Sequence, residues 1–233
     1  MLPSPTKQQP KNSSCLPWQN LKQYITVMAA KYAIFLDKDG TLIPDIPYNA
    51  NPDLISLEKN VGETLAKLAP YFALIIVSNQ SGLAFGYFDE HDLHRVKKRM
   101  TDLLNGYGVD LNDFYFCPHH PDGNVTPYAK LCDCRKPNPG LIIRAAAEHN
   151  ICLSGSWMIG DILNDVQAGK AAGCKSILID NGNETEWDMD GEPQRIPDFI
   201  APDFAAAGNY ILENLKHEKH FKPISTNFKQ LQK

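Results

Sequence analysis

The stretch AIFLDKDGTL at residues 33–42 decides the fold, because an apolar run typical of a buried parallel strand ends at Asp37 and Asp39 follows two residues later. Two further stretches have the same arrangement. LIIVSNQSG at residues 74–82 ends its apolar run at Ser78, and SWMIGDILND at residues 156–165 ends its run at Asp161. The carboxyl ends of parallel strands meet at one edge of a sheet, so we expect these three ends to converge on one crevice.

Around these stretches, apolar runs alternate with helical patterns from residue 32 onward. We expect strands at YAIFLD, YFALIIVS, DFYFC, WMIG and KSILID, and a weaker strand and helix between about residues 198 and 215. Helices are expected at about residues 58–69, 89–106, 140–149 and 163–172, the second of them capped by Asp89. Strands that alternate with helices through right-handed crossovers form an open, parallel, Rossmann-like α/β sheet with helices on both faces.

Length and composition set the limits of this fold. The 233 residues are enough for one α/β domain, which we assign to residues 31–215, with a flexible extension at 1–30 and a polar, lysine-rich tail at 216–233. A net charge of -4 argues against a nucleic-acid binder and favours a small soluble substrate. No apolar run reaches the roughly 18 residues of a membrane span, and the N-terminus lacks a secretory signal, so we expect a cytoplasmic protein. A monomer is expected because no heptad pattern is present.

The carboxylates behind the strands have the spacing that phosphoryl chemistry needs. Of the pair Asp37 and Asp39, one can attack phosphorus while the other protonates the leaving oxygen and later activates water. A divalent metal would screen the two approaching anions; Mg²⁺ prefers oxygen ligands, and Asp161 offers a remote carboxylate with Asp165 in support behind it. A turn or cap pair is the alternative explanation for a single DxD, but the polar strand ends at Ser78 and Asp161 favour catalysis.

A cluster of cysteines and histidines lies in the stretch CPHHPDGNVTPYAKLCDC at residues 117–134. Its C-x-H and C-x-C pairs, twelve residues apart, offer four ligands for a tetrahedral zinc: Cys117, His119, Cys132 and Cys134. Four protein ligands leave no open position, so the zinc would be structural. His120 competes with His119, but C-x-H matches the spacing of the second pair. Cross-linking this loop would fix Arg135 and Lys136. The scattered cysteines, Cys15, Cys152 and Cys174, are expected to be free thiols.

These motifs resemble those of the haloacid dehalogenase-like phosphohydrolases over about residues 33–180. DKDGT is similar to the first motif of that family, SN to the second, a loop lysine to the third and GDILND to the fourth. The resemblance implies that Asp37 is the nucleophile and Asp39 the general acid and base. It also implies that Mg²⁺ binds the Asp37 carboxylate, the Asp39 carbonyl and Asp161, while Ser78 and Lys136 hold the phosphoryl group.

The inserted loop, together with SNQSGLAFGYF and CRKPNPG, looks like the capless, zinc-containing branch of this family. That branch contains phosphatases of D-glycero-D-manno-heptose 1,7-bisphosphate and of histidinol phosphate, and the continuation SGLAFGYF is closer to the heptose enzymes. The resemblance implies a set of substrate-binding residues, namely Asp45, Ser78, Asn79, Gln80, Ser81, Arg135 and Lys136. For Asp45, a role as a turn residue beside Pro44 is an equally good explanation. Phe85 and Ile162 stand where the heptose enzymes commonly have arginine and lysine, which leaves the sugar phosphate and its anomer open.

Several functions therefore compete. The leading hypothesis is hydrolysis of the C7 phosphate of heptose 1,7-bisphosphate during the synthesis of nucleotide-activated heptose for surface polysaccharide, and histidinol phosphate or another small phosphomonoester is the alternative substrate. A non-catalytic zinc-binding interaction module is the alternative of a different class, although its loop would carry more basic and aromatic residues. Phosphoryl transfer of the mutase kind would need a cap, and about 40 residues between the first two motifs leave room for one loop and one helix.

Overall fold

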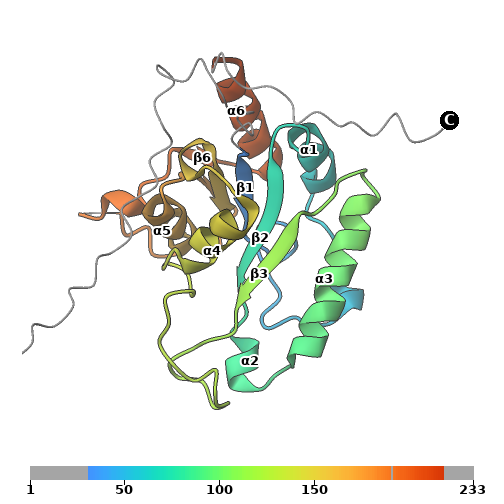
Figure 1. The fold of residues 1–233 in the computed structure, drawn as a ribbon, viewed down its shortest axis with the longest axis vertical. Coiled ribbons are helices and arrows are strands. Elements are labelled where there is room, and N and C mark those ends of the chain that lie inside the picture. Colours follow the sequence, from blue (N-terminus) through green and yellow to red (C-terminus); the bar gives the residue numbers. More distant parts are fainter. Residues whose placement is uncertain (1–30, 190, 218–233) are drawn as a thin grey trace, which may run out of the picture.

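The computed structural model describes residues 31–189 and 191–217; the extension predicted at 1–30 and most of the tail predicted at 216–233 lie outside the described residues. Its centre is a sheet of six parallel strands in the order β3-β2-β1-β4-β5-β6 (Figure 1). The strands are β1 (Ala33–Leu36), β2 (Ala73–Asn79), β3 (Asp113–Cys117), β4 (Trp157–Gly160), β5 (Lys175–Ile179) and β6 (Phe199–Ala201). The helices are α1 (Val61–Leu68), α2 (Gly82–Phe85), α3 (Glu90–Asn105), α4 (Gly140–His149), α5 (Leu163–Ala172) and α6 (Phe204–His217).

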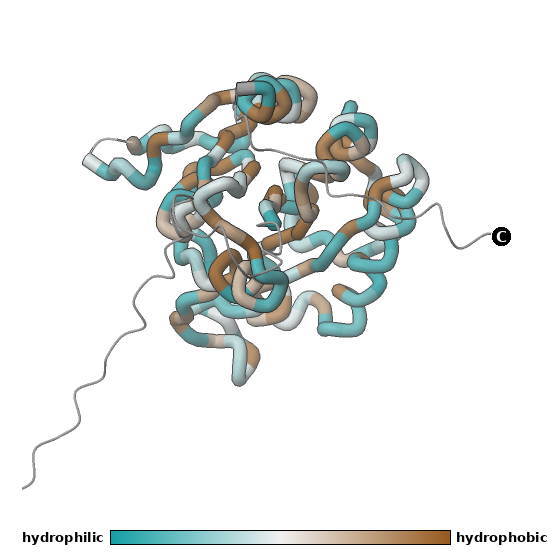
Figure 2. Tube along the Cα trace, turned by 45° about the horizontal axis from the view of Figure 1, so that its top comes forward, coloured by the Kyte–Doolittle hydropathy of each residue, from teal (hydrophilic) through white to brown (hydrophobic). Residues whose placement is uncertain are grey.

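The two faces of the sheet carry separate cores, because successive side chains of a strand point to opposite faces. Ile34 and Leu36 of β1 share a core with residues of α1, α3 and α6, whereas Ala33 and Phe35 share a second core with residues of α4 and α5. All four residues of β1 are buried. The hydropathy of the chain follows this layering, with apolar strands inside and polar helix faces outside (Figure 2). The predicted parallel sheet with helices on both faces is thereby confirmed.

The local patterns place most elements correctly. The predicted helices at 140–149 and 163–172 coincide with α4 and α5, and the helix predicted at 89–106 is α3. Asp89 caps α3 as expected, since its carboxylate accepts a hydrogen bond from the Asp92 amide at 3.0 Å while Asp92 accepts one from the Asp89 amide. The sequence did not predict α2, and α6 continues through His217. Between β1 and β2 the chain forms α1 and a short 3-10 turn (Pro52–Leu54), so no cap domain is inserted there.

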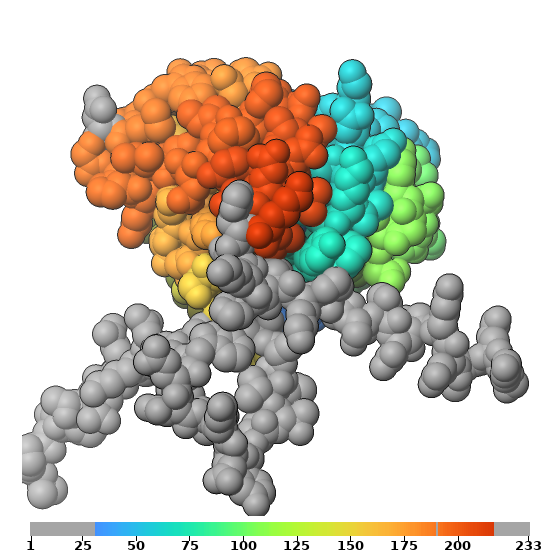
Figure 3. All heavy atoms as spheres, turned by 90° about the horizontal axis from the view of Figure 1, so that it is seen from above, coloured from blue at the N-terminus to red at the C-terminus, as the bar shows by residue number. Residues whose placement is uncertain are grey.

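The C-terminal helix closes one side of the sheet by packing against α1 (Figure 3). Gly208 of α6 lies close against α1, because a Cβ atom there would lie 2.1 Å from the Cγ2 atom of Thr64. The contact therefore needs glycine. In the described part of the chain, no helix is long and apolar enough to cross a membrane.

The strand order decides where the polar strand ends meet. β1 lies between β2 and β4, and the Asp37 amide continues the β1–β4 pairing by donating to the Ile159 carbonyl at 2.9 Å. All three strands run in the same direction, so the residues that follow them lie at one edge of the sheet. The expected convergence of the three motifs on one crevice is therefore built into the topology.

Candidate active site

Asp37 lies at the end of β1 and forms a buried ion pair with Lys136. The Lys136 ammonium contacts both Asp37 and Asp165, and its nitrogen lies 2.6 Å from the Asp165 carboxylate. Asp165 is fully buried and Lys136 is 4 % exposed. Burial disfavours the charged lysine, but the carboxylates of Asp165 and Asp37 outweigh it and raise the pKa of Lys136. One cation thus holds two aspartates from motifs that are more than 100 residues apart.

Asp161 follows β4 and faces the same cluster. Its carboxylate accepts hydrogen bonds from the Thr41 hydroxyl at 3.0 Å and from the Asn183 amide at 2.7 Å. Carboxylate oxygens of Asp37, Asp161 and Asp165 all lie within 4.8 Å of one another. Burial, reinforced by the charges of Asp37 and Asp165, raises the pKa of Asp161 to about 8. Lys136 pairs with two of these three clustered carboxylates, so the buried acidic cluster has more carboxylates than cationic partners and is suited to a divalent metal.

Gly40 makes the approach of Asp161 possible. Its φ of 77° lies in the left-handed region that favours glycine, and a Cβ atom there would lie 2.1 Å from an Asp161 carboxylate oxygen. The DKDGT turn therefore has its glycine for a steric reason. Asn181 fixes the same turn from another loop, since its side-chain amide donates to the Gly40 carbonyl at 2.7 Å.

Asp39 occupies a different environment from Asp37. One of its oxygens pairs with the fully buried Lys38, and the other accepts a hydrogen bond from the Gln80 amide at 3.0 Å. The Gln80 amide also donates to the Ser78 hydroxyl at 2.8 Å, which links the first and second motifs. Burial raises the pKa of Asp39 above its ordinary value, although Lys38 opposes the shift. A carboxyl with a raised pKa is suited to carrying a proton.

Lys136 is positioned by the second motif. The Lys136 amide donates to the Asn79 side-chain oxygen at 3.0 Å, and the Asn79 side-chain nitrogen donates to the Lys136 carbonyl at 3.1 Å. Both polar atoms of the Asn79 side chain are thus engaged by the lysine backbone. Direct contact of Asn79 with substrate stays a prediction.

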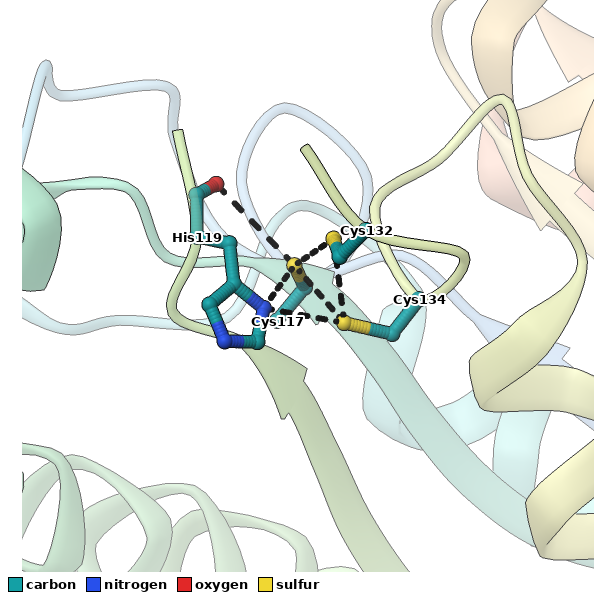
Figure 4. Close-up of side chains that lie close together, drawn as sticks. All are labelled: Cys117, His119, Cys132 and Cys134. Carbon is teal, nitrogen blue, oxygen red and sulfur yellow. Dashed lines mark hydrogen bonds between the residues drawn. The ribbon is translucent and has the colours of Figure 1, made fainter. Parts of the chain in front are cut away.

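The structure brings the four predicted metal ligands of the loop together (Figure 4). The sulfur atoms of Cys117, Cys132 and Cys134 lie 3.1–3.5 Å apart, and His119 Nδ1 lies 3.6 Å from the Cys117 sulfur and 3.3 Å from that of Cys134. Zinc–sulfur bonds of about 2.3 Å would place tetrahedral sulfur atoms about 3.8 Å apart, so the sulfur atoms would need to move apart slightly to hold the ion. His120 stays outside it and accepts a hydrogen bond from the Asp122 amide.

Burial raises the pKa values of the Cys117 and Cys134 thiols, so metal binding would release protons. The remaining cysteines differ from one another. Cys174 is free and buried, as expected. Cys152 is disulfide-bonded, so the expectation of a free thiol there was wrong. Cys15 lies outside the described residues.

The other predicted substrate residues line the same edge of the sheet. Ser81 immediately precedes α2, and Asp45 is exposed in the loop after β1. Arg135 directly follows the loop of residues 117–134, which we call the metal loop, and its guanidinium donates to the His119 carbonyl at 3.5 Å. The sequence reasoning missed the loop after β5. Besides Asn181 and Asn183, it supplies Glu184, which accepts a hydrogen bond from the Leu163 amide at the start of α5. The signal was present: the polar stretch DNGNE follows the apolar run KSILI, just as polar residues follow the other strands.

The fold and the site together define a class of protein. A parallel α/β sheet whose central strand ends in a buried, lysine-paired aspartate, with further carboxylates beside it, is the arrangement of enzymes that transfer phosphoryl groups to an aspartate. The chain also matches the HAD-hydrolase-like family over residues 133–207. It is 43% identical over 152 residues to the D-glycero-beta-D-manno-heptose-1,7-bisphosphate 7-phosphatase of Yersinia pestis, covering 64% of this chain and 81% of the relative.

Further relatives agree. The enzyme of the same name from Escherichia coli K12 is 41% identical over 185 residues, covering 78% of this chain and 89% of the relative. The D,D-heptose 1,7-bisphosphate phosphatase of B. bronchiseptica, solved with magnesium and phosphate, superposes with a TM-score of 0.66 at 30% identity, over 78% of this chain and 99% of that one. A HAD-like phosphatase structure from Mesorhizobium loti gives 0.67 at 32% identity, over 78% and 85%. The chain therefore belongs to the haloacid dehalogenase-like family of hydrolases, and it is a phosphomonoester hydrolase.

Proposed function

We propose that the protein is a Mg²⁺-dependent phosphatase that removes the C7 phosphate of D-glycero-D-manno-heptose 1,7-bisphosphate through an aspartyl-phosphate on Asp37. The names of the relatives support the substrate. The observation that carries the chemistry is the position of Asp37, at the end of the central strand, against Lys136 and within reach of two further carboxylates. A cytoplasmic location and a monomeric state stay predictions.

The acidic cluster of Asp37, Asp161 and Asp165 suits magnesium. Its donors are carboxylate oxygens, which Mg²⁺ prefers, and burial together with the charges of Asp37 and Asp165 raises the pKa of Asp161, a shift that a bound cation would oppose. We assign the ion to the carboxylates of Asp37 and Asp161 and the carbonyl of Asp39. When bound, it would neutralise charge between the aspartate and the phosphate oxygens.

Asp37, Asp39 and Lys136 then divide the reaction. A carboxylate oxygen of Asp37 attacks phosphorus, and the bond from phosphorus to the sugar oxygen breaks. Asp39 gives its proton to that oxygen, as its raised pKa favours. Asp39 next takes a proton from a water molecule, which attacks the phosphorus and releases phosphate from Asp37. Lys136 and the Ser78 hydroxyl bind the equatorial oxygens, where the transition state spreads its charge.

We also propose that zinc occupies the cluster of Cys117, His119, Cys132 and Cys134. Three sulfurs and one imidazole are ligands that favour zinc over magnesium, and four ligands close its coordination. Its role would be structural. The loop leads directly into Arg135 and Lys136, so a cross-link at Cys134 would fix the position of the catalytic lysine.

A substrate panel tests the proposal. Phosphate release is measured with both anomers of heptose 1,7-bisphosphate, with histidinol phosphate and with a nucleotide 3′-phosphate. We expect the highest kcat/KM for a heptose bisphosphate, and a clear preference for histidinol phosphate would instead select the alternative substrate. Asp37→Asn should abolish turnover, whereas the exposed Asp53→Asn should not change it. Full activity in Asp37→Asn would remove the proposed nucleophile, and an enzyme inactive on every phosphomonoester would favour a non-catalytic module.

A further inference from the structure

A group of four aromatic rings lies on the loops that follow the strands, and the proposed chemistry does not use it. The Tyr48 ring lies edge-on to the rings of Tyr87 and Phe85, at centroid distances of 4.7 and 5.9 Å. Phe85 stacks on Tyr87 at 5.8 Å and lies 4.9 Å from the His120 ring. We call these four residues the aromatic wall. Tyr48 is 50% and Tyr87 63% exposed, so large ring faces are open to solvent.

The wall belongs to the same edge of the sheet as the acidic site. Tyr48 follows β1, which ends at Asp37; Phe85 and Tyr87 follow the second motif; and His120 is adjacent to His119 in sequence. Hydrogen bonds join two of these segments. The amides of Asn124 and Val125 in the metal loop both donate to the Ala84 carbonyl of α2, at 2.7 and 2.9 Å, and Figure 1 shows that loop reaching α2.

The backbone at Tyr48 has a conformation that is unusual for a bulky residue. Its φ of 54° is left-handed, a conformation that costs a bulky residue about 1 kcal/mol or more. Strain of this kind persists where the surrounding structure enforces it, and it is concentrated at sites of binding.

The charge around the wall limits what it can bind. The segments that carry it, residues 44–51, 80–88 and 117–123, contain no lysine or arginine, and they contain Asp45 and Asp122. A phosphate would have no cationic partner from these segments. Exposed aromatic faces without cations instead suit the apolar face of a ring. Arg135, whose guanidinium donates to the His119 carbonyl at 3.5 Å, is a cation outside these segments that could bind a second phosphate.

We propose that the aromatic wall receives the ring of the leaving group, so that Phe85 and Tyr87 determine specificity for ring-bearing phosphomonoesters through stacking and not through a second anionic group. This inference rests on the proposed phosphatase function and names the part of the substrate that the wall recognises. The occupant is the pyranose of a sugar phosphate, lying with its C–H face on Phe85.

The test compares Phe85→Ala with the wild-type enzyme on heptose 1,7-bisphosphate, heptose 7-phosphate and the ringless glycerol 3-phosphate. We expect kcat/KM to fall by about tenfold for both heptose substrates, mainly through KM, and by less than about twofold for glycerol 3-phosphate. Tyr107→Ala is the matched control, because Tyr107 is 46% exposed but precedes β3 at the opposite edge of the sheet.

Three results would overturn the proposal that the aromatic wall binds the ring of the substrate. They are an unchanged kcat/KM in Phe85→Ala, an equal loss on glycerol 3-phosphate, which would indicate a structural role, and a loss confined to the bisphosphate. Should the heptose esters prove poor substrates, the proposed function fails separately. The ring-bearing p-nitrophenyl phosphate then replaces them in the same comparison with glycerol 3-phosphate, and the same criteria apply.

Discussion

Replacing Lys136 by methionine should destabilise the protein far more than the loss of a surface ion pair. The ammonium group lies against Asp37 and 2.6 Å from Asp165, and the side chains of Lys136 and Asp165 are 3% and 0% exposed. Lys136→Met keeps the length of the side chain but leaves two buried carboxylates without their cation. Breaking a buried pair in this way costs about 3–5 kcal/mol. The variant should also lose about 100- to 1000-fold in kcat, because a preorganised charge at the phosphoryl oxygens is removed.

The pH dependence sharpens this expectation. Burial and the charge of Asp37 raise the pKa of Asp165 to about 6, even with Lys136 opposing the shift. Below that pH, Asp165 binds a proton in the folded protein and no longer needs the lysine. The loss of unfolding free energy in Lys136→Met should therefore be largest near about pH 8 and smaller near about pH 5.

The assay is urea unfolding without added magnesium at both pH values. Lys98→Met is the control, because Lys98 pairs with Asp102 at 2.7 Å but is 76% exposed, and its loss should cost less than about 0.5 kcal/mol. Adding Asp165→Asn to Lys136→Met should restore part of the stability, since the uncompensated charge is then gone. If Lys136→Met unfolded at the same urea concentration as Lys98→Met, the buried charge pair would not have the energetic role assigned to it.

Three further predictions concern the metals. Asn183→Ala removes the amide that holds Asp161, so the Mg²⁺ concentration for half-maximal activity should rise about tenfold or more while kcat at saturating Mg²⁺ changes little; an unchanged Mg²⁺ titration would contradict this. Because the pKa of Asp161 is raised to about 8, the folded protein binds more protons than the unfolded chain. Without Mg²⁺ the free energy of unfolding should therefore fall from about pH 4 to about pH 8, and the rise in melting temperature on adding Mg²⁺ should grow over that range. Calorimetry that shows no such trend would refute this prediction. Cys132→Ser should reduce bound zinc, measured by elemental analysis, from about one ion per chain to near zero and lower both the melting temperature and kcat, whereas Cys174→Ser should retain the metal.

The strands and most helices were predictable because each depends on a run of neighbouring residues. α4 and α5 are long enough for helical periodicity to show, whereas α2 has four residues and spans barely one turn. The grouping of Asp37 and Asp161 was also predictable, since parallel strands bring their ends together. Their partners were not. Thr41 and Asp161 are 120 residues apart, and nothing local to either residue reveals the hydrogen bond between them.

The choice between His119 and His120 shows the same limit within one loop. Matching the spacing of the two ligand pairs favoured His119, and its ring does lie among the cysteines. The His120 ring instead lies beside Phe85, at the end of α2. Its position depends on where α2 lies, and the sequence did not predict this helix.

The two hydrogen bonds from Asn124 and Val125 to the Ala84 carbonyl have a practical consequence for anyone redesigning this enzyme. They dock the metal loop on α2, and the hydrogen bond from the Tyr128 hydroxyl to Glu90 also docks the loop on the start of α3. Exchanging either segment alone for that of a relative would leave the other without its docking surface. Chimeras should therefore transplant residues 80–90 and 117–135 together, and selectivity and metal retention should be inherited as a pair.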